Sequence, residues 1–240
     1  MLSKIIRKIL ENLSIFFLNN LNNLKYDDES IYKIIENRIK INKNNNNLKK
    51  THIIFNENLY SLLKNRKLKK FLRYSFIQKI FFVHNRLFIL KELNELKNSE
   101  NWLFFEKLLI EDNVGDPIRY FLYPRSSGNK INHVYHLSCL EKNLNIKLQN
   151  IKNVFEFGGG YGCMARIFSQ ISEQIKYKIF DTNLVNCLQY YYLKQNDLDV
   201  GFDNNKFELV NNLRDLNFNK NLENSLFIAN WSLSEVPLSL

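Results

Sequence analysis

The sequence predicts an α/β protein in which a helical N-terminal region precedes a parallel sheet. Residues 153–157 form an apolar run that stops at closely spaced glycines, and residues 163–168 then open a helix. A strand, a glycine turn and a helix in this order are typical of a parallel βαβ unit, and a continuous apolar run predicts a strand covered on both faces. Neither glycine nor proline interrupts residues 59–96, which predicts one or two long helices there.

The same patterns predict the remaining elements and three regions. Residues 1–110 are expected to be helical, residues 111–150 to form a loop and a helix, and residues 151–240 to form the sheet. Further helices are expected at 1–25, 27–39, 102–110, 132–140 and 184–193, and further strands at 177–181, 206–210 and 225–230. The apolar stripe of residues 1–25 favours packing on the rest of the protein over binding to a membrane surface.

Composition limits the kind of partner and the compartment. The 240 residues carry a formal net charge of +10, which favours anionic partners. Lysine and asparagine are abundant along the whole chain, however, so a solvated basic surface explains the charge better than a nucleic-acid footprint. Three widely spaced cysteines without a Cys-x-x-Cys pair indicate a reducing, cytoplasmic setting. No apolar run approaches the ~20 residues of a membrane-spanning helix.

The glycine turn has the spacing expected of a cofactor loop. The dinucleotide pattern Gly-x-Gly-x-x-Gly is only partly matched, because its third glycine is replaced by Cys163. Read as Glu-x-Gly-x-Gly-x-Gly, all four positions match, with Glu156, Gly158, Gly160 and Gly162. Bare backbone lets a ligand approach closely while the amides of the following helix face it. The alternative is a tight turn that binds no ligand.

Polar residues follow each of the later strands. Asp181 ends the second strand, 23 residues after Gly158, where nucleotide-binding folds place an acid that accepts hydrogen bonds from ribose hydroxyls. Asp181 could instead cap the following helix. Asn212 follows the third strand, where such folds contact the adenine. Asn230 and Trp231 follow the fourth strand, which flanks the crevice of a doubly wound sheet.

Together these residues carry a family resemblance. The glycine turn resembles the first motif of the class I S-adenosylmethionine-dependent methyltransferases. With the segment Asn230-Trp231-Ser232-x-Ser234-Glu235, about the last 130 residues resemble sugar O-methyltransferases of bacterial surface polysaccharides. The resemblance implies a Rossmann-like sheet, S-adenosylmethionine as cofactor, and methylation of a hydroxyl in a sugar or glycan precursor. The cofactor-binding residues would be Glu156, Gly158, Gly159, Gly160, Tyr161, Gly162, Asp181, Asn212, Asn230 and Trp231.

Three residues are candidates for the base that would activate the acceptor hydroxyl. They are His133, His136 and Glu235, and each could instead be structural. The two histidines are three residues apart on one helix face, a spacing that could bind a metal. Without a third ligand in view, no metal site is expected.

The resemblance also implies further strands after residue 230, for which the sequence leaves too few residues. Class I sheets usually have seven strands, three of them after the segment that matches 225–230, whereas this chain stops at Leu240. A C-terminally truncated sheet of about four parallel strands is therefore expected, with an open apolar edge that a protein partner or a second copy would cover. A non-catalytic, truncated methyltransferase-like binding module is the alternative to an enzyme. An RNA methyltransferase that uses the basic helices is a third and weaker hypothesis for the function.

Overall fold

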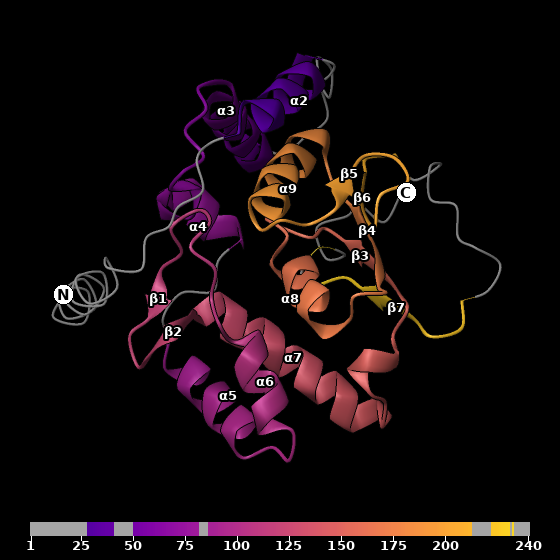
Figure 1. Ribbon diagram of the computed structural model, residues 1–240. Helices are drawn as coiled ribbons and strands as arrows, with labels where there is room; N and C mark the ends of the chain where they lie inside the picture. Colours follow the sequence, from indigo (N-terminus) through magenta and orange to yellow (C-terminus); the bar gives the residue numbers. More distant parts are fainter. Residues whose placement is uncertain (1–27, 41–49, 82–85, 213–221, 231, 233–240) are drawn as a thin grey trace, which may run out of the picture. The chain divides into compact units, whose positions relative to one another are not determined.

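The computed structural model describes residues 28–40, 50–81, 86–212, 222–230 and 232 (Figure 1). The helix expected at 1–25 lies outside the described residues. The chain divides into two compact units: residues 27–68 with 147–240, and residues 1–26 with 69–146. The described residues form eight α-helices and a five-stranded parallel sheet, so the α/β prediction is confirmed.

The unit formed by 27–68 and 147–240, here called the sheet unit, contains the parallel sheet. Its elements are α2 (Glu29–Lys40), α3 (Lys50–Lys64), η3 (Leu148–Asn150), β3 (Asn153–Phe157), α8 (Cys163–Ile171), β4 (Lys176–Phe180), α9 (Asn183–Gln195), β5 (Val200–Gly201), β6 (Phe207–Val210) and β7 (Ser225–Ile228). The four strands and two crossover helices expected between 153 and 230 are all present. The strands and α9 lie within two residues of their expected bounds, and α8 ends three residues beyond the expected 163–168. The sequence missed β5, because a strand of two residues shows no periodicity.

The order of the strands is β5-β6-β4-β3-β7, and every neighbouring pair is parallel. The chain builds outward from β3 to β4 and β6, and then returns to the other side of β3 with β7. Leaving β5 aside, this is the 3-2-1-4 order of a doubly wound sheet. The fold is therefore compatible with a Rossmann-like fold. Its switch point, where such sheets open their ligand crevice, lies at the carboxyl ends of β3 and β7.

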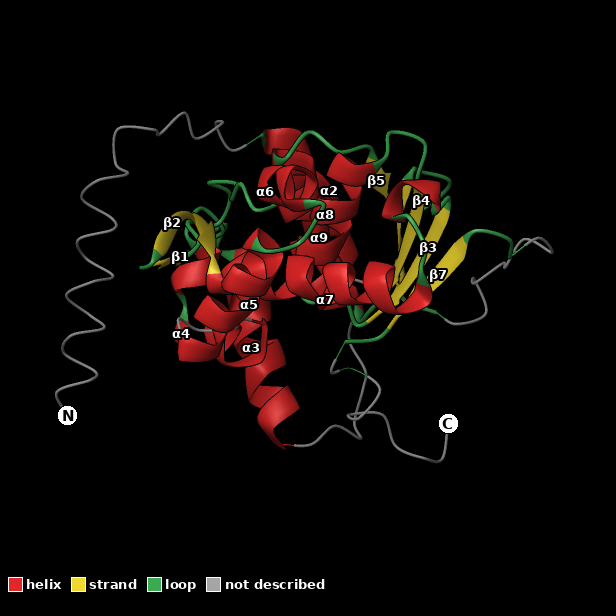
Figure 2. Ribbon diagram, turned by 90° about the horizontal axis from the view of Figure 1, so that it is seen from below, coloured by secondary structure: helices red, strands yellow, loops and turns green. Residues whose placement is uncertain are grey.

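The two faces of the sheet are unequally buried, so the expectation that β3 is covered on both faces is wrong for the described residues. Burial alternates along β3 and β4, as it does in strands with one covered face. The covered face carries Tyr177, whose ring contacts Phe168 of α8 and Phe207 of β6. The other face carries Phe155, which is half-buried and stacks on the exposed Phe227 (ring centroids 5.6 Å apart). Figure 2 shows α8 and α9 on one side of the strands.

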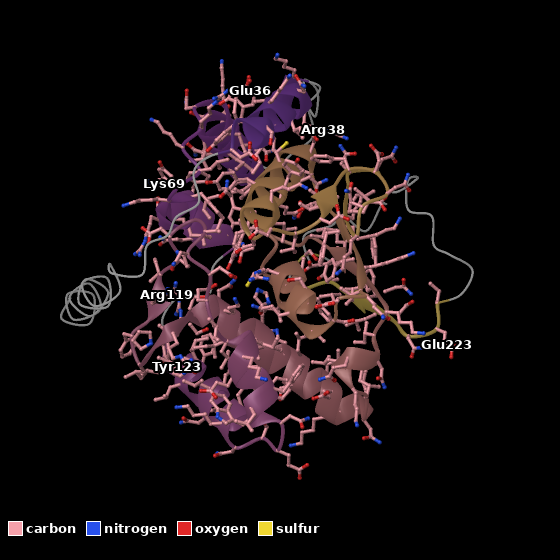
Figure 3. All side chains as sticks on the ribbon, in the orientation of Figure 1. Glu36, Arg38, Lys69, Arg119, Tyr123 and Glu223 are labelled. Carbon is pink, nitrogen blue, oxygen red and sulfur yellow. The ribbon has the colours of Figure 1, made fainter. Side chains whose placement is uncertain are left out.

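Helices α2 and α3 belong to the sheet unit and pack on α9. Tyr32 of α2 contacts Tyr191 of α9, with their ring centroids 6.0 Å apart. The amide of Asn183 donates to the carbonyl oxygen of Arg38 at 3.0 Å. The guanidinium of Arg38, labelled in Figure 3, lies 3.9 Å from the centre of the Phe202 ring. The first two contacts join α2 to α9, and the third joins α2 to the chain after β5.

The expectation of one or two long helices across 59–96 is wrong, because α3 ends at Lys64. Arg66 adopts the left-handed conformation (φ 55°), and its N–H donates to the carbonyl of Leu63 while that of Lys67 donates to Leu62. This is the Schellman ending, in which glycine is the usual residue. Arg66 bonds to Glu29 and Glu36 of α2. An arginine in the place of a glycine hid this helix end from sequence analysis.

The second unit, here called the helical unit, is described over residues 69–146 apart from 82–85. It contains η2 (Phe71–Arg73), α4 (Ser75–Phe81), α5 (Leu87–Lys97), α6 (Trp102–Leu108), β1 (Arg119–Tyr120), β2 (Tyr123–Ser127) and α7 (Gly128–Leu144). Its core includes Ile89, Leu93 and Leu96 of α5, spaced so that they share one helix face. The antiparallel hairpin β1–β2 was expected to be loop. Ser127 caps α7 by accepting from the Lys130 N–H at 3.1 Å.

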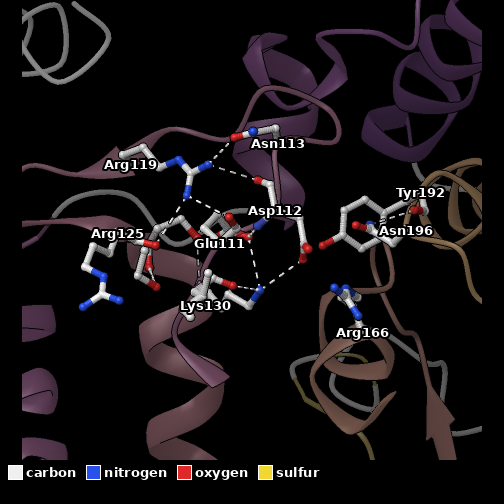
Figure 4. A network of polar contacts seen from close by, with 12 residues as sticks. Glu111, Asp112, Asn113, Arg119, Arg125, Lys130, Arg166, Tyr192 and Asn196 are labelled. Carbon is white, nitrogen blue, oxygen red and sulfur yellow. Dashed lines mark hydrogen bonds and ion pairs between the residues drawn. The ribbon is translucent and has the colours of Figure 1, made fainter. Parts of the chain in front are cut away.

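A buried ionic network holds the loop before α7 in the helical unit (Figure 4). The ammonium of Lys130, whose side chain is fully buried, donates to the Ile110 carbonyl (2.6 Å) and to Asp112 (3.2 Å), and lies 3.6 Å from Glu111. Arg119 donates to the carbonyl oxygens of Glu111 and Asp112. Because buried charges are costly unless they are paired, this network fixes the path of residues 110–113.

None of the helices in the described part of the chain combines the length and the apolarity that crossing a bilayer requires.

Candidate functional site

The glycine turn lies at the carboxyl end of β3, beside the switch point of the sheet. Its backbone is held at both ends: the Gly158 N–H donates to the Phe180 carbonyl at 2.8 Å, and the Gly162 N–H donates to the Gly159 carbonyl at 2.9 Å. Gly158, Gly160 and Gly162 have φ of 72°, 56° and 97°. Residues with a Cβ rarely adopt these values, so the turn depends on glycine for its shape.

Two of the glycines are also required by packing within the chain. A Cβ on Gly158 would lie 2.3 Å from the Cβ of Ser232, whose hydroxyl donates to the Phe157 carbonyl. A Cβ on Gly159 would lie 2.6 Å from Cγ2 of Ile179 and 2.9 Å from a carboxylate oxygen of Glu156. The turn therefore lies closely over β3 and β4. Ser232, which follows β7, lies against Gly158 at the start of the turn.

Glu156 lies beneath the turn and is buried, with 3% of its surface exposed. The Tyr177 hydroxyl donates to its carboxylate at 2.8 Å. Burial raises the pKa of Glu156 to about 7; the bond from Tyr177 opposes this rise, and the negative charge of Asp181 adds to it. This geometry makes Glu156 a support for the turn. The contact between Glu156 and a cofactor, expected from the sequence, stays a prediction.

Asp181 stands directly after β4, and the side chain of Gln189 links it to the turn. Its carboxylate accepts from the Thr182 N–H at 2.8 Å and from the Gln189 amide at 3.1 Å. The same amide donates to the Gly160 carbonyl at 2.9 Å. The helix cap of α9 is Thr182, whose hydroxyl accepts from the Val185 N–H at 3.5 Å, so the alternative reading of Asp181 as that cap is wrong.

The other residues expected to bind the cofactor are spread around this end of the sheet. Tyr161 is a core residue, 2% exposed, whose ring meets that of Tyr192 edge-on. Asn212 is exposed directly after β6, and Asn230 is half-buried after β7. Trp231 and Glu235 lie outside the described residues. Gln189 thus links the expected Asp181 to the turn, and the expected Glu156 lies beneath the turn.

The two candidate histidines belong to the helical unit, where both lie on α7. Burial, and then the neighbouring His136, lower the pKa of His133 to about 3, and its buried Nδ1 has no hydrogen-bond partner among the described residues. A base with such a pKa accepts a proton poorly at neutral pH. Burial also lowers the pKa of His136.

The polar residues of α9 that support this site were not predicted from the sequence. Asn183, Asn186 and Gln189 are spaced three apart on a helix that is otherwise largely apolar, and all three are buried. The Asn186 amide donates to the Asp181 carbonyl at 3.4 Å, next to the contacts of Gln189. The signal was present in the sequence: a polar stripe at helical spacing, immediately after the expected acid.

The cavity found in the sheet unit does not lie at the glycine turn. A cavity of about 290 Å³ is lined by residues 149–152, Ser172, Gln174 and Asn224. It lies at the amino end of β3, away from the glycine turn. No group of three or more metal-binding side chains that could hold an ion occurs within the described ranges.

Comparisons with protein-family models, with curated proteins and with solved structures find no match for this chain. The fold and the geometry of the site therefore define the class: an α/β protein with a parallel sheet, compatible with a Rossmann-like fold, whose glycine turn and following acid lie together.

Proposed function

We propose that the sheet unit binds S-adenosylmethionine and that the chain is an O-methyltransferase acting on a hydroxyl of a sugar or glycan precursor. The observation that carries the proposal is the link from Asp181 through Gln189 to Gly160, at the carboxyl ends of the first two strands of a 3-2-1-4 sheet. In such sheets the ligand lies outside these strand ends.

The residues present fit the nucleoside part of this cofactor. A carboxylate can accept about four hydrogen bonds, so an oxygen of Asp181 that accepts one from the protein can also accept one from a ribose hydroxyl. Gly160 presents backbone without a Cβ beside it, which allows a ligand to approach closely. The cofactor supplies the methyl group on its sulfonium, and the protein's part is to bind it, orient the acceptor and exclude water. The sugar acceptor rests on the sequence resemblance.

Calorimetry with S-adenosylhomocysteine tests the cofactor assignment. The wild-type chain should bind, and Asp181→Ala should weaken binding by roughly tenfold or more, because a hydrogen bond to a charged group is lost. Gly160→Val should also weaken binding, because valine strains a backbone with positive φ. Asp203→Ala, which removes an exposed carboxylate of the same unit, is the control. Absence of binding by the wild-type chain would overturn the proposal.

Binding without catalysis is the second candidate, and the exposed ring of Phe227 on β7 favours it. An apolar ring on a strand at the edge of the described sheet is a surface where another protein could pack. Transfer of a labelled methyl group from S-adenosylmethionine to a panel of nucleotide sugars separates the two candidates. Turnover by the purified chain would exclude the non-catalytic module.

A further inference from the structure

Helix α9 buries uncharged amide side chains on the side that meets the glycine turn and Asp181. Asn186 and Gln189 have no exposed surface, and their carbonyl oxygens have no hydrogen-bond partner among the described residues. Burying an amide costs free energy unless its hydrogen bonds are made. Two such residues, one helical turn apart, therefore call for an explanation beyond packing.

The contacts of Gln189 fix the orientation of its amide. Both of its N–H groups have acceptors, the Gly160 carbonyl at 2.9 Å and the Asp181 carboxylate at 3.1 Å. A flipped amide would place its oxygen against two other oxygens, so the assignment of nitrogen and oxygen follows from the partners. The amide thus forms a bridge between two segments that are 21 residues apart in the sequence.

Backbone contacts also hold the two segments in place. The backbone of Asp181 is held by the Val210 carbonyl, which accepts from its N–H at 3.0 Å, and by the Asn186 amide, which donates to its carbonyl. These contacts fix where β4 ends. The Gly158 N–H ties the first residue of the turn to the Phe180 carbonyl at 2.8 Å, and Gln189 adds a side-chain link between the Asp181 carboxylate and Gly160.

We propose that Gln189 is a positioning residue of the cofactor site, which holds the Asp181 carboxylate in register with the glycine turn so that a ribose bound by the acid lies against the turn. The identity of the ligand rests on the proposed function, whereas the bridging role does not. Because the bridge acts through Asp181, its loss should weaken the binding only of ligands whose hydroxyls Asp181 would bind.

The bridging role is tested without ligand by hydrogen exchange on the full chain. Gln189→Met keeps the length of the side chain but removes both donors. Gln195→Met is the matched control, because Gln195 is a buried glutamine at the end of the same helix, away from the turn and the acid. We expect faster exchange at residues 158–162 and 181–182 in Gln189→Met than in Gln195→Met. Equal exchange in the two variants would overturn the inference.

The effect on ligand binding is tested with two probes. One is S-adenosylhomocysteine, and the other is its analogue without the 2′ and 3′ hydroxyls. Gln189→Met should lose roughly tenfold in affinity for the first and little for the second, because the second offers nothing for Asp181 to bind. A loss of equal size for both probes would show that the substitution only loosens the fold, and would contradict a positioning role.

The outcomes separate the inference from the proposed function. If the wild-type chain binds neither probe while exchange changes as expected, the cofactor assignment falls and the bridge stands. If the wild-type chain binds and Gln189→Met binds both probes as tightly, the positioning role of Gln189 falls and the cofactor assignment stands.

Discussion

At the scale of single residues, Gly159 shows that a glycine can be required by contact rather than by backbone conformation. Gly159→Ala places a methyl group within 2.6 Å of Ile179 Cγ2, so we expect the free energy of unfolding to fall by about 1–3 kcal/mol in urea denaturation. Ile179→Ala removes that atom. The double variant should therefore lose less stability than the sum of the two single losses. Strict additivity would show that the two residues do not clash.

Glu156 makes stability depend on pH, because its pKa of about 7 lies above the ordinary value of 4.5. The folded state then binds the proton more tightly than the unfolded state. The free energy of unfolding should fall as pH rises from about 4.5 to about 7, and should stay level above that range. Glu156→Gln cannot ionise, so relative to wild type it should gain on the order of 3 kcal/mol across this range.

Urea denaturation at a series of pH values measures this gain. Glu57→Gln removes an exposed carboxyl group on α3 and serves as the control. A difference between Glu156→Gln and wild type that is the same at every pH would show that Glu156 titrates normally.

At the scale of elements, α7 is tied to the loop before it by the ammonium of Lys130. Lys130→Met fills the same space but leaves Glu111 and Asp112 without their buried cation. We expect a loss of about 3–5 kcal/mol in the free energy of unfolding, measured by chemical denaturation. Lys142→Met, on the exposed part of the same helix, should have little effect. Glu111→Gln with Asp112→Asn should recover part of the loss, because neutral amides do not need the positive charge of Lys130.

The elements also show what could be predicted from the sequence and why the rest could not. Strands and helices from 153 onward carry clear apolar patterns with glycine or polar boundaries, so β3, α8, β4, α9, β6 and β7 were predictable. The end of α3 was not, because Arg66 adopts a conformation that usually signals glycine. The bridge of Gln189 was missed because it depends on how α9 is rotated against the turn. Pairings between distant segments are set by packing, which one sequence does not reveal.

At the scale of the whole molecule, net charge and apolar surface oppose one another. The chain carries +10, which resists self-association, while Phe227 is 54% exposed beside Phe155. Salt screens the charge but not the apolar contact. We therefore expect light scattering to show association that increases with salt, and Phe227→Ser to reduce it. Leu103→Ser, at an exposed leucine of the helical unit, is the control. Equal association in both variants would rule out the sheet face as its cause.

The buried thiols of the two crossover helices provide a natural chemical reporter. Cys163 opens α8 and Cys187 lies in α9, both enclosed, and burial raises the pKa of Cys187 to about 12. An enclosed thiol that keeps its proton does not react with alkylating reagents. Pulse alkylation followed by mass spectrometry would therefore time the opening of each helix separately, with no label introduced. The half-buried Cys139 of α7 would report on the helical unit in the same experiment.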